Sequence, residues 1–151
     1  MNFPRYKLWL VLGALLGGLA VILGAFGAHG LEAALESQRQ MADGLSEAEI
    51  TKKLANWETA ARYQMYHALA LVGVGLLTSR RCGRAINVAG STFTLGTLIF
   101  SGCLYLLVLT GHKWLGAVVP LGGALLITGW VCLAVAVWRH AEPAATVRVV
   151  E

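Results

Sequence analysis

The run NWETAARYQMYHALAL, residues 56–71, passes from a polar, aromatic half into an apolar half without a turn signal. Its centre carries Tyr63, Gln64, Tyr66 and His67, inside a segment with the length of a membrane span. Polar side chains inside a bilayer are costly and usually face protein or trapped water. We therefore expect this segment to be the helix around which the others pack.

The composition is that of an integral membrane protein. Of the 151 residues, 57% are hydrophobic and 13% are charged, and the mean hydropathy is +0.65, which a soluble globular domain does not show. Four segments have the roughly 20 residues that a 30 Å hydrocarbon core requires, namely about 8–29, 57–78, 85–109 and 115–138. The sequence predicts one all-α domain, residues 1–151, that forms a four-transmembrane-helix bundle, multi-pass in the cell (inner) membrane.

Charge placement predicts the topology. The net charge of +4 comes from 12 Lys and Arg against 8 Asp and Glu. In a four-helix topology one side would hold Arg5, Lys7, Arg80, Arg81, Arg84, Arg139 and Arg148. By the positive-inside rule that side is cytoplasmic, so both termini are expected there. We interpret these residues as topology signals and expect no nucleic-acid partner.

Residues 30–56 are expected to form the first outer loop. Ser46 and Glu49 have the spacing of a capping box, which predicts that a helix begins there. Ile50 and Leu54 continue the apolar spacing that ends at Trp57, so this short helix is expected to be amphipathic and to lie on the membrane surface. The tail, residues 140–151, is predicted to be mobile.

Small residues recur at helical spacing in the first, third and fourth segments. Small residues let two backbones approach closely inside a bilayer, so the pattern predicts helix-packing faces. We assign to these faces Gly13, Gly17, Gly24, Gly27, Gly90, Gly116, Pro120, Gly122 and Gly123.

The second segment carries two different polar features. Glu58 and Arg62 are four residues apart and are predicted to form an ion pair that anchors the helix at the membrane surface. Tyr63, Tyr66 and His67 lie nearly opposite, on one side of the helix. His67 is about 15 Å along the axis from the beginning of the span, so its imidazole is expected to be neutral and hydrogen-bonded.

Depth counting suggests a partner for His67 on the third segment. Counted inward from Leu109, Ser101 reaches about the depth of His67, and Tyr105 reaches that of Tyr63. The candidate polar pocket therefore comprises His29, Tyr63, Gln64, Tyr66, His67, Ser101 and Tyr105. It is either an outward-opening pocket for a proton, ion or small polar molecule, or a dry set of groups that bond to one another.

The sequence shows no sign of a metal centre or a catalytic site. Cys82, Cys103 and Cys132 have no metal-ligand spacing, and we expect no disulfide between them. His29 and His67 would lie about 13 Å or more apart in regular helices, which is too far to share a metal. We see no nucleophile with a base and no phosphate loop, and we expect neither a cofactor nor enzymatic activity.

Several motifs resemble a known family. They are GAFGAH at 24–29, WETA at 57–60 with RYQMYHALA at 62–70, FSGCLY at 100–105 with LTG at 109–111, and PLGG at 120–123 with GW at 129–130. Together they resemble the YgdD-like small inner-membrane proteins, a family of unknown function with mitochondrial relatives. The resemblance implies four transmembrane helices and no established activity.

Two functions compete on these grounds. The favoured one is a non-enzymatic protein that works by association in the bilayer, as a homo-oligomer or as an accessory subunit of a larger membrane complex, because small-residue faces are abundant. The alternative is binding or transport of a proton, ion or small polar molecule through the pocket around His67.

Overall fold

The computed structural model describes residues 5–41, 44–80 and 83–139, and every regular element in these ranges is helical. The elements are α1 (Arg5–Phe26), the π-helical turn η1 (Gly27–Leu31), α2 (Glu32–Arg39), α3 (Glu47–Arg80), α4 (Arg84–Thr110) and α5 (Trp114–Arg139). Because α1, η1 and α2 follow one another without a gap, the described chain forms four rods. The predicted mobile tail and Cys82 lie outside the described residues.

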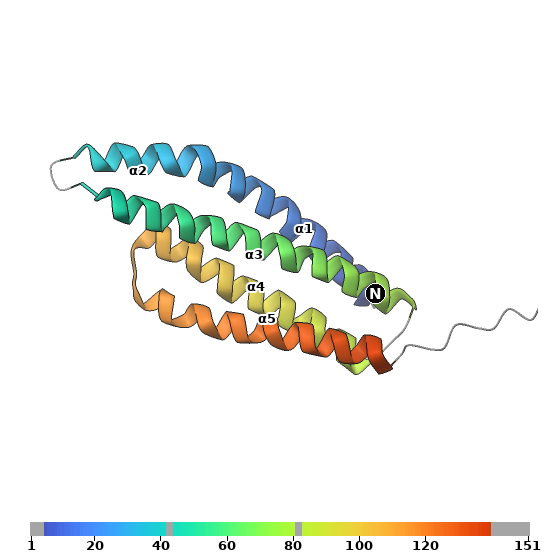
Figure 1. Cartoon of the computed structure of the whole chain (residues 1–151). Coiled ribbons are helices and arrows are strands. Elements are labelled where there is room, and N and C mark those ends of the chain that lie inside the picture. Colours follow the sequence, from blue (N-terminus) through green and yellow to red (C-terminus); the bar gives the residue numbers. More distant parts are fainter. Residues whose placement is uncertain (1–4, 42–43, 81–82, 140–151) are drawn as a thin grey trace, which may run out of the picture.

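The rods pack in the order α1, α3, α4, α5 (Figure 1). α1 packs on α3, α3 on α4, and α4 on α5, whereas α1 touches α4 over a small area and forms no comparable interface with α5. The arrangement is therefore an open row. Along the helix axes, the beginning of α1 and the end of α5 lie at the same end of the bundle. At the other end, α2 and the first turns of α3 extend beyond the α4–α5 turn (Figure 1).

The expectation of four membrane-spanning helices is wrong. Among the described residues, three helical stretches are long and apolar enough to cross a membrane: Arg5–Arg39, Arg84–Thr110 and Trp114–Arg139. α3 has the length but not the composition, because its charged first turns run directly into Arg62, Gln64 and His67. The predicted placement of both termini in the cytoplasm depends on four membrane crossings, so three crossings remove its basis.

α3 also begins ten residues earlier than the predicted second segment, at Glu47 instead of Trp57. Residues 47–72 contain neither glycine nor proline, so nothing interrupts the helix that Ser46 caps. The capping box is present: the Glu49 carboxylate accepts hydrogen bonds from the Ser46 amide (2.9 Å) and hydroxyl (2.7 Å). The predicted short amphipathic helix is thus the first part of α3, and most of the predicted outer loop is helical.

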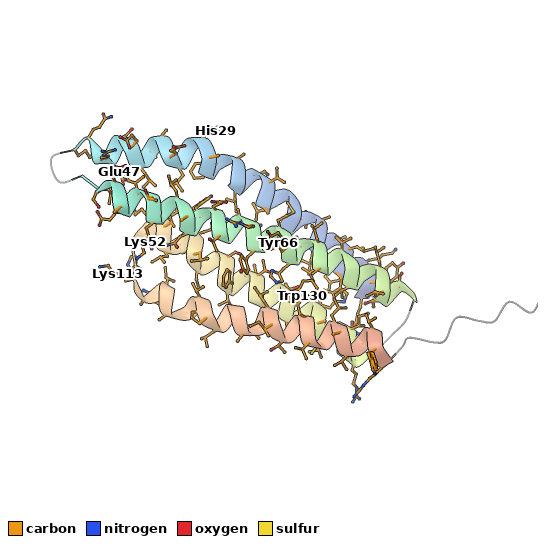
Figure 2. The ribbon with its side chains drawn as sticks, viewed as in Figure 1. His29, Glu47, Lys52, Tyr66, Lys113 and Trp130 are labelled. Carbon is orange, nitrogen blue, oxygen red and sulfur yellow. The ribbon has the colours of Figure 1, made fainter. Side chains whose placement is uncertain are left out.

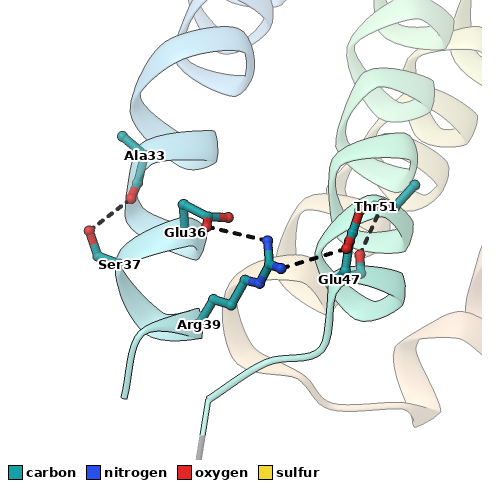
Figure 3. A network of polar contacts seen from close by, with 6 residues as sticks. All are labelled: Ala33, Glu36, Ser37, Arg39, Glu47 and Thr51. Atoms are coloured by element: carbon teal, nitrogen blue, oxygen red, sulfur yellow. Dashed lines mark hydrogen bonds and ion pairs between the residues drawn. The ribbon is translucent and has the colours of Figure 1, made fainter.

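An ion-pair network joins α2 to α3 beside the short connection at residues 40–46 (Figure 3). The Arg39 guanidinium lies 3.4 Å from the Glu36 carboxylate on α2 and 3.6 Å from the Glu47 carboxylate on α3. All three side chains are well exposed, so the network contributes little to stability and mainly orients the two helix ends.

α1 and α3 approach closely along the glycine face of α1. A Cβ on Gly13 would lie 2.8 Å from the Ala68 carbonyl oxygen, so only glycine fits there. At the other end of this interface the Trp57 indole packs against Gly27 and donates a 2.7 Å hydrogen bond to the Leu23 carbonyl. Leu23 lies one turn before η1, where the helix widens to π-type bonding. The indole N–H thus satisfies a carbonyl close to the point where the hydrogen-bonding pattern of the helix changes.

Candidate functional site in the groove between α3 and α5

His67 lies at the centre of the row, on the side of α3 that faces α4 and α5. Its side chain is 4% exposed. Nδ1 lies 2.7 Å from the carbonyl oxygen of Tyr63, one turn earlier on the same helix. Nε2 accepts a 3.2 Å hydrogen bond from the indole N–H of Trp130 on α5. Both ring nitrogens are therefore occupied.

These two partners determine the tautomer of His67. A carbonyl oxygen only accepts and an indole N–H only donates, so Nδ1 must carry the proton and Nε2 must accept. Protonation of Nε2 would place two donors against each other. The geometry thus supports the neutral imidazole that the sequence predicts. The imidazole of His67 bridges α3 to α5.

Aromatic rings surround this hydrogen bond. The ring centroid of Phe93 on α4 lies 5.6 Å from that of His67 and 5.1 Å from that of Trp130. Tyr63 stacks on Phe100 of α4 at 4.9 Å. Such tilted and offset pairs are favourable arrangements of aromatic side chains. The polar contact is embedded in apolar surface.

A groove of about 670 Å³ runs past this cluster, with α3 and α5 as its walls and α4 as its floor. Figure 2 labels one residue of each wall, Tyr66 and Trp130. The lining is apolar apart from the imidazole of His67, the hydroxyls of two tyrosines and the indole N–H of Trp130. It comprises Tyr63, Tyr66, His67, Leu69, Phe100, Gly123, Leu126, Ile127 and Trp130. Tyr63 and Tyr66 are 40% and 53% exposed, so they face outward along the groove.

Ser101, the predicted partner of His67, instead donates a 2.8 Å hydrogen bond to the carbonyl of Ala60. Tyr105 lies against Trp57, with ring centroids 4.6 Å apart, and not beside Tyr63. Both pairings are displaced by six or seven residues along α3, or about 10 Å. The physical reason is that depth was counted from Trp57, although α3 begins well before it.

The predicted pocket is therefore divided. Gln64 is buried on the α1 side, where its amide donates a 2.9 Å hydrogen bond to the Leu16 carbonyl. His29 is exposed on η1. Tyr105 is buried, and its hydroxyl has no hydrogen-bond partner among the described residues. Tyr63, Tyr66 and His67 alone line the α3–α5 groove.

The predicted ion pair is present, and the predicted packing glycines differ in how closely they are packed. Glu58 and Arg62 form an exposed ion pair at 2.7 Å. Gly122 lies against the backbone of Phe100, and Gly90 lies against the Trp9 ring. Small residues with looser surroundings are Gly17, Gly24, Gly116 and Gly123, and Pro120 is exposed. Within the described ranges no three His, Cys, Asp or Glu side chains converge on a point that could hold a metal ion.

Sequence reasoning missed Trp130 as the partner of His67, because a tryptophan in a membrane helix most often lies at the membrane interface. A signal was available. Trp130 follows Ile127 by three residues on the face that also carries Gly123, so it lies on the helix side that faces the groove. Trp114 and Trp138, at the two ends of α5, are 63% and 85% exposed, as interfacial residues are.

Three apolar helical stretches of spanning length and a polar contact sheltered among aromatic rings define an α-helical, multi-pass membrane protein. Residues 23–123 match the family model described as "Protein of unknown function (DUF423)".

Among curated proteins, the chain is 42% identical over 135 residues to a UPF0382 membrane protein of Staphylococcus aureus (strain bovine RF122 / ET3-1), covering 89% of this chain and 98% of the relative. It is 38% identical over 135 residues to the UPF0382 membrane protein YwdK of Bacillus subtilis (strain 168), with the same coverage. The chain belongs to this DUF423/UPF0382 family of membrane proteins. No solved structure matches it.

Proposed function

We propose that this chain is a non-enzymatic membrane protein that acts by association with other membrane-embedded helices. The observation that carries the proposal is the open row: α5 packs mainly on α4, so a three-sided apolar groove remains between α3 and α5. A single further helix seated in the groove would bury exposed aliphatic and aromatic groups such as Ile127, at 67% exposure, and Tyr66. Helix association in bilayers depends on this kind of packing.

The proposed occupant is a helix of a second copy. α1 offers a ridge of exposed aliphatic side chains at helical spacing, Val11, Leu15, Leu19 and Ile22, which are 46–66% exposed. A ridge on one copy that fits a groove on another is a heterologous contact, which produces rings or larger arrays. An accessory role in a larger membrane complex would use the same groove with a different helix.

The contacts of His67 favour a structural role over transport. A proton or ion pathway needs a group that is free to exchange protons or to bind the ion. Both nitrogens of His67 are occupied within the protein, and the side chain is buried. The proposal therefore includes no ion pathway. That the chain has no enzymatic activity and no nucleic-acid partner stays a prediction, and the proposed partners are the lipid bilayer and other membrane chains. The narrower likeness to YgdD-like proteins and their mitochondrial relatives stays a prediction.

The experiment compares two tryptophan substitutions on α5. Ile127→Trp fills the groove, whereas Leu121→Trp changes a residue of similar exposure, 64%, that does not line it. Native mass spectrometry in mild detergent should show oligomers for the wild type and for Leu121→Trp, and mainly monomer for Ile127→Trp.

Co-purification of differently tagged copies distinguishes self-association from an accessory role. Recovery of the second tag supports the homo-oligomer, and recovery of one distinct subunit that Ile127→Trp loses supports the accessory role. A wild type that is monomeric at every concentration and recovers no partner contradicts the proposal.

A further inference from the structure

A second hollow, of about 600 Å³, lies beside the turn that joins α4 to α5. It is walled by α3, α4 and α5, as the groove is, but none of its lining residues lines the groove. Its rim is basic, with Lys52 and Lys53 from α3 and Lys113 from the turn; we call these residues the lysine mouth. Figure 2 labels Lys52 and Lys113 near the α4–α5 turn.

Within the described ranges the positive charge of the lysine mouth is only partly balanced. Glu49 is the one acidic residue that lines this hollow, so three positive charges face one negative charge. Hydrogen bonds from Ser46, and to a smaller extent the charges of Lys53 and Lys113, lower the pKa of the Glu49 carboxyl. Among the described residues none of the three lysines forms an ion pair. Lys53 donates a 3.3 Å hydrogen bond to the Val108 carbonyl, which holds its ammonium group over the last turns of α4.

Below the ammonium groups the hollow becomes apolar. Its walls there are Leu104 and Leu107 from α4 and Val119 from α5. Gly116 lies opposite Leu107, where an added Cβ would be 3.9 Å from the Leu107 side chain, so the missing side chain keeps the hollow open. A cationic rim above an apolar strip matches a molecule with an anionic head and hydrocarbon chains.

We propose that the lysine mouth binds the phosphate group of an anionic phospholipid, whose acyl chains enter the apolar strip below it. Basic clusters beside membrane helices attract anionic headgroups in this way. A free phosphate ion would use the lysines but gain nothing from Leu104, Leu107 and Val119. The inference is independent of the proposed association, because the residues that it uses differ from those around Ile127.

The test uses the full chain in mild detergent and two synthetic lipids, dioleoylphosphatidylglycerol and dioleoylphosphatidylcholine. Native mass spectrometry measures how many lipids the protein retains, and thermal unfolding measures the stabilisation by each lipid. We expect the wild type to retain one phosphatidylglycerol per chain and to discriminate against phosphatidylcholine. Because each lysine near a headgroup strengthens binding about fivefold, Lys52→Gln/Lys53→Gln/Lys113→Gln should weaken it by at least about tenfold.

A matched control removes the same charge from the helix ends that lie away from the α4–α5 turn. Lys7→Gln/Arg84→Gln/Arg139→Gln changes three exposed cations outside the hollow and should leave phosphatidylglycerol retention within about twofold. Equal losses in the two triple variants would overturn the proposal, because they would show attraction by net charge alone. If the lysine triple variant fails to fold, the single variant Lys113→Gln in the turn should still weaken binding by about fivefold.

A second pair of variants separates a lipid from a free anion. Gly116→Leu fills the apolar strip and leaves the lysines in place, whereas Ala117→Leu, at an exposed position on the same helix, does not line the hollow. We expect only Gly116→Leu to lose phosphatidylglycerol. Two results would overturn the proposal: displacement of the lipid by millimolar inorganic phosphate, or full retention of phosphatidylglycerol by Gly116→Leu. Either would show that the site binds the anionic group and not the acyl chains.

Discussion

The two sides of α3 are built differently. Towards α1, backbones meet: a Cβ on Gly13 would lie 2.8 Å from the Ala68 carbonyl oxygen and 2.9 Å from the Val72 nitrogen. Towards α5, large side chains keep the helices apart, and the hydrogen bond from Trp130 to His67 bridges a groove of about 670 Å³. Close packing comes from glycine, and the groove comes from aromatic residues.

The difference separates two tasks along one helix. On the α1 side Gln64 and Trp57 are buried, and each donates a hydrogen bond to a backbone carbonyl of α1. The α5 side leaves apolar surface uncovered. Stability should therefore depend more on the α1 side, and association with other molecules should depend more on the α5 side.

The largest expected effect is at the glycine contact. Gly13→Ala introduces a methyl group against the backbone of α3, and rigid backbone cannot yield as a side chain can. Overpacking of this kind costs about 1–3 kcal/mol. Gly18→Ala on the same helix is the control, because a Cβ there meets nothing within 4 Å.

Unfolding of the two variants in detergent, followed by circular dichroism, measures the difference. Gly18→Ala should be neutral or gain up to about 1 kcal/mol, since alanine favours helix over glycine. Equal stability of Gly13→Ala and Gly18→Ala would contradict the close approach of α1 to α3.

Two tryptophan substitutions compare the sides of α3 directly. Trp57→Phe leaves the Leu23 carbonyl without its indole donor at a site where Trp57 is 3% exposed, and should cost about 1–2 kcal/mol. Trp130→Phe removes the donor to His67 at a half-exposed site, where the cost should be about 0.5–1 kcal/mol. Thermal unfolding of both variants gives the ranking, and a greater loss from Trp130→Phe would reverse our account of the two sides.

The smallest effect concerns the beginning of α3. Hydrogen bonds from the Ser46 hydroxyl and amide lower the pKa of Glu49 below its ordinary value. A lowered folded-state pKa means that the ionised carboxylate stabilises the first turn above the ordinary pKa of about 4.3, and that this contribution is lost as the pH falls through the folded-state value. NMR titration in micelles should show the Glu49 pKa rising in Ser46→Ala; an unchanged titration midpoint would contradict the capping box.

Much of the local structure could be predicted from the sequence. The capping box at Ser46 and Glu49 depends on residues three apart, and the ion pair of Glu58 with Arg62 depends on residues four apart. The close approach at Gly13 also follows from helical spacing. The number of spanning helices did not follow, because the apolar second half of α3 is too short for a span by itself and the half before it is charged and polar.

The register between helices could not be predicted. Ser101 and Tyr105 lie about two turns from their predicted neighbours, because depth was counted from an assumed membrane boundary and not from real helix ends. The π-helical turn η1 was not predicted either; it lies next to the hydrogen bond from Trp57 to Leu23, two residues that are far apart in sequence. The register between helices depends on tertiary packing, which the spacing along one helix does not encode.

The central claim is that His67 is a neutral, buried bridge between α3 and α5. Nitrogen NMR of the ¹⁵N-histidine-labelled protein in detergent at pH 7 tests this most directly, with His67→Phe used to assign the signal. We predict one neutral tautomer with the proton on Nδ1 and a hydrogen bond to Nε2 that Trp130→Phe removes. An imidazolium, a proton on Nε2, or a signal indifferent to Trp130→Phe would contradict the account.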